Sequence, residues 1–512
     1  METKIHHPYT WKMVLYIVNV CWASAAYGYA SSIIATTLGQ PSFYAYMGLD
    51  TNPNTAALIG AMNGLYYTGG FFGCVAIGKI ADRWGRKMSI YIGIVIVLIS
   101  NALLAGSVNT AMFIVFRFFQ GVGAFIELAT VPLWITEVVP PKDRGMLIDL
   151  HPIFANIGYV MASYVGVGFF YYKNAAGNEW RAPLAIGCLP CILCLVSMPF
   201  VPESPRWLLL KGRREEAWQI VKSLHHSPHT DNTSFAEREF YLMREQTEYE
   251  RTHKMTTWQM LKSPAYRKRL LIGCGLPFLL QSSGVLVINN YGTLLYSGLG
   301  FGPEQQLHLQ AGWLVVSFVL NCVAVLIVDR LPRPVLITIG LVGAAAALIV
   351  ECAIQASYLG TDNRSALAAG VAMLYVYVFF YAMFLDGPTF FYLGEIFPTH
   401  ARSQGLTLGM ASFCLADIVW LQAAPTAFQN IGWKYYLFFI IITAAGAAWA
   451  WFTFPDTRNL PLEQIAVLFG DVDHQAPELR AIPAEPVTKI AQHDEGRMET
   501  EKHVELEERE TL

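Results

Sequence analysis

Charge is what this sequence has little of. Only 14% of its 512 residues are charged, whereas soluble globular proteins average about 25%, and 54% are hydrophobic. The formal net charge is −3 at neutral pH, which excludes a nucleic-acid-binding protein driven by bulk electrostatics. Because so much of the chain does not suit contact with water, its composition favours a multipass membrane protein.

Cysteines are few, and all nine lie inside apolar runs. Cys188, Cys191 and Cys194 recur at helical spacing, but no histidine or carboxylate lies near them in the sequence, so we interpret them as packing residues. The sequence predicts no disulfide scaffold, no metal and no cofactor. It has no nucleophile–base pair spaced for catalysis, which argues against an enzyme. The start, METKIHHPYTWK, is short and polar, so we expect no signal peptide before the first apolar run.

Long apolar runs are what the sequence does have. A membrane span needs about 20 apolar residues. Twelve runs meet this requirement: 12–36, 56–80, 89–107, 111–136, 146–171, 183–201, 270–298, 309–328, 335–356, 366–393, 404–428 and 434–454. The predicted fold is an all-α membrane protein with 12 transmembrane helices in two pseudo-symmetric six-helix bundles.

Polar segments divide these spans into predicted domains. The N-terminal bundle covers 1–202, and the C-terminal bundle covers 270–455. Between them lies a cytoplasmic linker, 203–269, in which GRREEAWQIVKSLHH places its apolar residues on one helical face. A charged tail, 456–512, is predicted to be largely disordered.

The distribution of basic residues predicts the orientation. With a cytoplasmic N-terminus, only four of the 35 lysines and arginines lie in outward segments: Lys173, Arg181, Arg364 and Lys434. A further one, Arg117, lies within a span. This asymmetry follows the positive-inside rule, so we expect both termini in the cytoplasm.

Three charged signatures at helix ends occur once in each half. GKIADRWGRK matches VDRLPRP, ITEVVPPKDRG matches GEIFPTHARSQG, and PESPRWLL matches FPDTRNLPLEQI. Partly buried acid–base pairs at these ends can join neighbouring helices and separate when the two halves rock apart. The predicted gating salt bridges involve Asp82, Arg86, Glu137, Arg144, Glu203, Arg206, Asp329, Arg333, Glu395 and Arg402.

With these motifs and RFFQGVGA, the chain resembles the sugar porter family of the major facilitator superfamily, from the first span to LPLEQIA. The resemblance implies two bundles that alternate access to a site at the middle of the membrane. It also implies a sugar-like small-molecule substrate. We expect a monomer in the lipid bilayer, with the plasma membrane as its location.

Several sugar-binding positions of that family are altered here. The resemblance assigns Gln281 to substrate binding, but Leu280 and Leu286 stand where the seventh span would carry amides. Pro152 replaces a glutamine, and Phe390 replaces a tryptophan. A site that hydrogen-bonds hydroxyls discriminates strongly through those bonds. We therefore expect a substrate that is larger or less hydroxylated than glucose.

Other polar residues within the spans are further candidates for substrate binding, because polar groups at depth are costly. Each could instead hydrogen-bond between helices as packing. With Gln281 and Phe390, the candidates are Asn289, Asn290, Glu127, His151, Asp386, Asp417 and Ser317.

Arg117 bears on coupling. In proton symporters of the family, the matching arginine faces an acid on the first span, but here that acid is replaced by Ala30. The simplest reading is facilitated diffusion. Proton coupling through Glu127 or Asp386 remains an alternative, since an apolar setting raises a carboxyl pKa. Two further alternatives concern the function itself. The protein could be a non-transporting nutrient sensor, which the modest length of the tail disfavours, or an exporter of a secondary metabolite.

Overall fold

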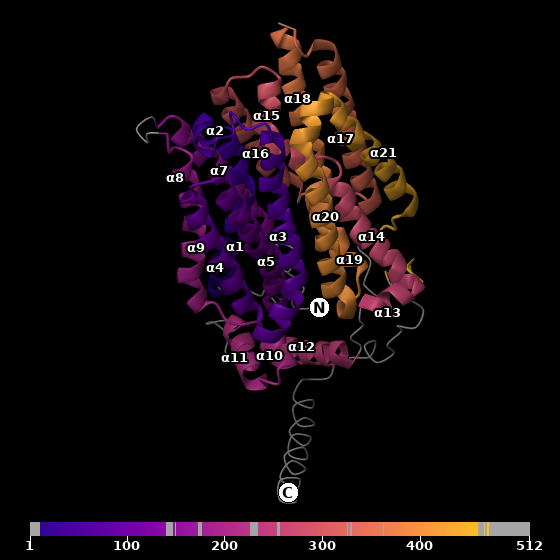
Figure 1. Ribbon diagram of the computed structural model, residues 1–512. Helices are drawn as coiled ribbons and strands as arrows, with labels where there is room; N and C mark the ends of the chain where they lie inside the picture. The colour runs from indigo at the N-terminus through magenta and orange to yellow at the C-terminus, as the bar shows by residue number, and fades with distance from the viewer. Residues whose placement is uncertain are drawn as a thin grey trace, which may run out of the picture.

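The computed structural model describes residues 11–139, 147–148, 150–172, 177–225, 234–252, 257–324, 326–327, 330–361, 363–458, 465 and 468–470. Within these ranges the regular structure is entirely helical. The helices of the first half, in indigo and purple, run beside those of the second half, in orange and yellow (Figure 1). Short helices of the linker lie across one end of the bundle, at the bottom of the view.

Six long helical segments form the N-terminal half. A short helix, α2 (Pro41–Met47), follows the first of them, and the sixth segment is divided in two at Gly187. The segments are α1 (Trp11–Leu38), α3 (Thr55–Trp84), α4 (Arg86–Ala105), α5 (Thr110–Val138), α7 (Leu150–Phe170) and α8 (Arg181–Ile186) with α9 (Cys188–Ser197), which ends in η1 (Met198–Phe200).

The C-terminal half also has six segments, two of which are interrupted. The first breaks at Gly284, whose φ of +91° suits glycine, and the fourth contains a π-helical turn. The segments are α14 (Pro264–Gln281) with α15 (Val285–Gly298), α16 (Pro303–Ala324), α17 (Arg333–Tyr358), α18 (Arg364–Tyr381) with η2 (Ala382–Asp386) and α19 (Gly387–Ile396), α20 (Thr399–Ile431), and α21 (Tyr435–Thr453), which η3 (Gly432–Lys434) precedes.

Among the described residues, length and hydropathy identify ten stretches able to cross a membrane. The last covers 50 residues and contains α21 and most of α20. In addition, α3 is a long helix of 30 residues. The described helices thus correspond to the twelve predicted spans, and the predicted fold class is confirmed. The breaks within three of the segments were not predicted, because a local turn barely alters the hydropathy of a 20-residue window.

Glycines set how closely the helices approach. A Cβ on Gly121 of α5 would collide with the backbone oxygen of Tyr66 on α3, and one on Gly158 of α7 would collide with that of Ala25 on α1. Small residues at such crossings allow backbones to approach closely, which is how membrane helices gain packing energy. Gly64 of α3 is covered by a side chain of the other half, that of Gln422 on α20, so the two halves also meet tightly along this pair of helices.

The linker forms α10 (Pro205–Leu210), α11 (Arg214–His225), α12 (Ser234–Thr252) and α13 (Thr257–Lys262). Its apolar faces pack on one another through Trp207, Ala217, Val221 and Met243. The indole Nε1 of Trp207 donates to the backbone oxygen of Asp82, at 3.1 Å, and so anchors α10 to the end of α3. The predicted disorder of the tail concerns residues that lie almost wholly outside the described ranges.

Candidate functional site

The charged signatures of the N-terminal half form a buried network. Arg86, at the start of α4, donates two hydrogen bonds to the carboxylate of Glu137 on α5, each at 2.8 Å. Ser204 also donates to Glu137, at 2.5 Å. The positive φ of Gly85 (+99°) makes the turn between α3 and α4, and the Glu203 carboxylate lies against this glycine where a Cβ would collide. We call these residues the N-terminal latch.

Glu203 accepts hydrogen bonds from the backbone N–H groups of Arg86 and Lys87, at 3.0 and 3.1 Å. Burial raises the pKa of its carboxyl, although these bonds and the charge of Arg86 oppose that change. The linker therefore joins the membrane helices through a carboxylate whose proton affinity is altered by its surroundings.

The C-terminal half repeats this construction. Arg333, at the start of α17, donates to Glu395 of α19 at 2.9 and 3.3 Å, and Thr457 donates to the same carboxylate at 2.6 Å. Asp456 accepts from the backbone N–H of Arg333 at 3.2 Å. Asp456 and Thr457 thus occupy the places of Glu203 and Ser204. Neither was among the predicted gating residues, although the match of FPDTRN to PESPRW contained the signal.

Three other predicted gating residues lie beside the N-terminal latch or its C-terminal counterpart, which we call the C-terminal latch and which consists of Arg333, Glu395, Asp456 and Thr457. Asp82 is 3.6 Å from Arg86 and largely exposed. Arg402 donates to the backbone oxygen of Phe397 at 3.4 Å, and Arg206 lies on α10. Arg144 and Asp329 are outside the described residues.

Arg117 is fully buried among neutral acceptors. Its guanidinium donates to the Ala30 carbonyl at 2.9 Å and to the Gln120 amide at 2.6 Å. Weaker bonds reach Met62 and Asn63, at 3.3 and 3.4 Å. None of these four acceptors can gain or lose a proton near neutral pH.

Polar and aromatic residues of the two halves meet between the bundles. Asn290 of α15 donates to the hydroxyl of Tyr67 on α3 at 3.4 Å, and Tyr67 lies 3.5 Å from the hydroxyl of Ser31 on α1. Gln281 lies close to the hydroxyl of Tyr381. Tyr159 and Tyr381 both lie within electrostatic reach of two carboxyls of the second half. We call this set the interbundle cluster: Ser31, Tyr67, Tyr159, Gln281, Asn290, Tyr381, Asp386 and Asp417.

The two carboxyls of the cluster have few partners. Asp386 ends the π-helical turn, is partly exposed and accepts a hydrogen bond from Asn321 at 3.0 Å. Asp417 is 1% exposed, and its Oδ2 has no hydrogen-bond partner. Two more predicted residues lie on the helical segments of Asn321 and Asp386: Ser317 of α16 is partly exposed, and Phe390 of α19 is 41% exposed.

Besides Ser317 and Phe390, three further predicted site residues are not part of the cluster. Asn289 binds Gln310 of α16, which donates to its side chain at 3.2 Å. His151 contacts the hydroxyl of Ser24, at 2.7 Å, and so joins α7 to α1 within the N-terminal half. Glu127 is fully buried, lies against Gly93 of α4, and has no side-chain partner for either carboxylate oxygen.

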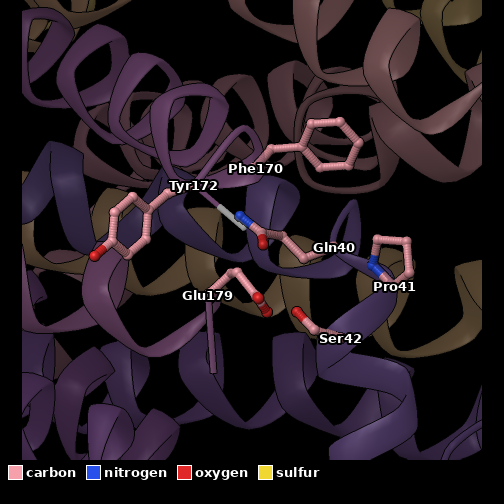
Figure 2. A pocket seen from close by; sticks show the side chains of 6 residues that line it. All are labelled: Gln40, Pro41, Ser42, Phe170, Tyr172 and Glu179. Atoms are coloured by element: carbon pink, nitrogen blue, oxygen red, sulfur yellow. The ribbon is translucent and has the colours of Figure 1, made fainter. Parts of the chain in front are cut away.

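A separate cavity of about 180 Å³ lies at the end of the bundle away from the linker helices. Its lining combines the amide of Gln40, the hydroxyl of Ser42 and the carboxylate of Glu179 with two aromatic rings (Figure 2). Gln40 is held by a hydrogen bond from its amide nitrogen to the Gly166 carbonyl, at 3.2 Å. None of the predicted site residues lines this cavity.

The two halves also touch at this end through α7 and α16. The hydroxyl of Tyr171 donates to Glu304 at 2.6 Å and lies 2.9 Å from His308. Across the described part of the chain, no group of three histidine, cysteine, aspartate or glutamate residues is placed to hold a metal ion.

Two bundles of six spans, mirrored latches at one end and a polar cluster between the bundles define a class of protein: a multipass membrane transporter and not an enzyme. The chain belongs to the sugar (and other) transporter family, whose model matches residues 16–469.

Relatives cover nearly the whole chain. An MFS-type transporter, criB, of Aspergillus cristatus is 30% identical over 448 residues, which are 87% of this chain and 90% of that protein. A probable quinate permease of Aspergillus fumigatus is 27% identical over 477 residues, 90% of this chain and 88% of its own length.

Solved structures agree on the fold. The inward-open xylose transporter XylE of E. coli has a TM-score of 0.72 at 22% identity and covers 88% of this chain and 98% of its own. XylE bound to 6-bromo-6-deoxy-D-glucose has a TM-score of 0.73 at 21% identity, over 89% and 99%. The twelve-helix major facilitator fold is therefore common to this chain and XylE.

Proposed function

We propose that this protein carries a sugar-like, hydroxylated small molecule across the membrane by alternating access, with the interbundle cluster as its binding site. The amides of Gln281 and Asn290 and the hydroxyls of Ser31 and Tyr67 offer both donors and acceptors, as a polyhydroxylated solute requires. They come from both halves, so rocking one bundle against the other would expose the site to either side in turn.

The relatives support this substrate class. A quinate permease and a xylose transporter are named for small, ring-forming polyhydroxylated solutes. The replacement of amides by Leu280 and Leu286 favours a substrate with fewer hydroxyls than a hexose, or a larger one.

We propose facilitated diffusion as the mode of transport, and this proposal is based on the hydrogen-bond partners of Arg117. Its guanidinium is bonded to the carbonyl of Ala30, where an acid would be needed to release and rebind a proton. Without a titrating partner, that arginine cannot couple a proton to substrate movement.

Uptake of labelled glucose and of a labelled disaccharide into yeast lacking its own hexose carriers tests both the substrate class and the mode of transport. Each uptake is run with and without a protonophore, at a measured surface level of the protein. We expect saturable uptake that the protonophore does not reduce. Gln281→Leu at equal surface level is expected to lose most of it. No uptake of either sugar by protein that reaches the surface contradicts the proposal.

Proton-coupled transport through Asp386 is the second candidate. It is favoured by the position of this partly exposed carboxyl, which is bonded to Asn321 at 3.0 Å, in a site that meets both bundles. In that case the protonophore abolishes accumulation of the sugar, and Asp386→Asn abolishes it equally without a protonophore.

The proposed setting is the plasma membrane, with both termini in the cytoplasm and the monomer as the functional unit. The four basic residues in the outward segments, against 35 in the chain, support this orientation. An epitope at either terminus is expected to be labelled only after the cells are permeabilised. Labelling of intact cells would contradict the proposed orientation.

A further inference from the structure

The interbundle cluster has two carboxyls and no cation. The ion pairs of the described residues include neither Asp386 nor Asp417, and Asn321 is a neutral partner. An isolated carboxylate is expensive to bury, and such groups are normally paired. Two of them between the bundles therefore need either a proton or a cation that arrives from outside.

The unmet hydrogen bonds of the cluster are all of one kind. Asp417 Oδ2, Gln281 Oε1 and Asn290 Oδ1 are buried acceptors without a donor. An amide can turn over and present its nitrogen instead, whereas an ionised carboxylate has no donor to offer. What the site lacks is consequently a group with several N–H or O–H donors.

Arg117, which is fully buried, cannot supply them. Arg117 already donates four hydrogen bonds within the N-terminal half, to Ala30, Gln120, Met62 and Asn63. Its positive charge and the two negative charges belong to different bundles, and no ion pair joins them.

Aromatic side chains of both halves lie near the two carboxyls. Tyr159 and Tyr381 lie within electrostatic reach of both carboxyls. Phe125 of the first half lies 6.2 Å from Phe413 of the second, ring to ring, and 5.8 Å from Tyr67. Carboxylates combined with aromatic faces are a common means of binding an organic cation.

We propose that the substrate carries a protonated amine, which Asp417 and Asp386 bind while the rings of Tyr159 and Tyr381 lie beside it. The ammonium group provides three donors and one positive charge, which are what the cluster lacks. This inference rests on the proposed function and narrows it, from a hydroxylated solute to one that also bears a basic nitrogen.

Competition binding to the purified full-length protein tests the proposal, with D-glucose, D-glucosamine and N-acetyl-D-glucosamine as probes. At pH 6 the amine of glucosamine is charged, whereas the other two probes are neutral. We expect glucosamine to bind roughly tenfold more tightly than glucose, or better, as a hydrogen-bonded charge would give. N-acetylglucosamine should not show this advantage.

Asp417→Asn and Asp386→Asn should each reduce the preference for glucosamine, and the double variant should abolish it. Glu351→Gln is the matched control, because Glu351 is a buried carboxylate of the same bundle with an unpartnered oxygen, bonded to Gln355 and outside the interbundle cluster. It should keep the full preference.

Equal affinity of the wild type for glucose and glucosamine overturns the inference, as does a preference that survives in the double variant. Tighter binding of the quinate anion than of either sugar overturns it too. If any of these results is obtained and glucose uptake in the yeast assay is saturable, the amine proposal is wrong but the proposed transport function is not contradicted. Failure of all probes to bind or to be taken up contradicts both.

Discussion

The two halves of the molecule share their ends and differ in their middles. At one end, Arg86 with Glu137 and Arg333 with Glu395 form the same bidentate pair, each completed by a hydroxyl donor from the segment that follows the bundle. In mid-bundle, the first half buries the cation of Arg117, and the second half brings two carboxyls to the interface. The shared parts serve the movement, and we attribute substrate recognition to the parts that differ.

One pair of positions makes the difference explicit. Gly93 lies seven residues after Arg86 and faces Glu127, and Gly340 lies seven residues after Arg333 and faces Leu385. The same packing position therefore holds a carboxylic acid in one half and a leucine in the other. Packing at this position does not require a carboxyl, and Glu127 is buried against Gly93 of its own bundle.

The largest expected effect comes from opening one latch and then the other. Arg86→Ala leaves Glu137, 10% exposed, without its partner and should cost about 3–5 kcal/mol of stability. Arg333→Ala removes the partner of Glu395, but this side chain is already 29% exposed. Because water can then hydrate the carboxylate, the cost should be about 1–3 kcal/mol. Thermal unfolding in detergent measures both, and a larger loss for Arg333→Ala would contradict the order.

Restoring an acid beside Arg117 should change the coupling. Ala30→Asp places a carboxylate next to a guanidinium that now bonds the Ala30 carbonyl at 2.9 Å. We expect the sugar uptake of this variant to become sensitive to a protonophore by several-fold, while the wild type stays insensitive. Ala30→Asn is the control, since it has the same shape without a titratable group. Identical behaviour of the two variants would rule out this role for the position.

Exchanging the matched residues of the two halves should change stability in opposite directions. Glu127→Leu removes two buried acceptors that have no partner, so we expect a gain of about 1–3 kcal/mol with uptake retained. Leu385→Glu introduces such a group against Gly340 and should cost a similar amount. If Glu127→Leu abolishes uptake in a stable protein, Glu127 has a functional role that this comparison denies it.

The smallest effect concerns pH. Because burial raises the pKa of Glu203, the folded protein keeps this proton to higher pH than the unfolded chain does. The stability that this group contributes is therefore present below its ordinary pKa of 4.5 and is lost as pH rises through the raised value. Glu203→Gln should flatten that decline, by less than about 1 kcal/mol. Parallel pH profiles of melting temperature for the two proteins would contradict this assignment.

The spans and the latches could be predicted from the sequence for physical reasons. A run of about 20 apolar residues has few other uses, and Arg86 and Arg333 belong to motifs that repeat in order. The interruptions could not, because neither the break at Gly284 nor the π-helical turn before Asp386 changes the average hydropathy.

The direction of individual side chains was also beyond the sequence. From the sequence, Glu127 and Asp386 are both carboxyls within predicted spans and equally good candidates for the site. Which of them faces the partner bundle depends on how each helix is rotated within its own bundle, and that rotation is set by packing against Gly93 in one case and by the π-helical turn in the other.

Uptake of labelled glucose by Asp386→Asn and Glu127→Gln, compared at equal surface level, tests the central claim most directly. Both substitutions remove one carboxylate and keep its shape, one at the bundle interface and one inside the N-terminal half. The account predicts that Asp386→Asn loses or strongly alters uptake, while Glu127→Gln transports as the wild type does. Normal uptake by Asp386→Asn with loss in Glu127→Gln would contradict it.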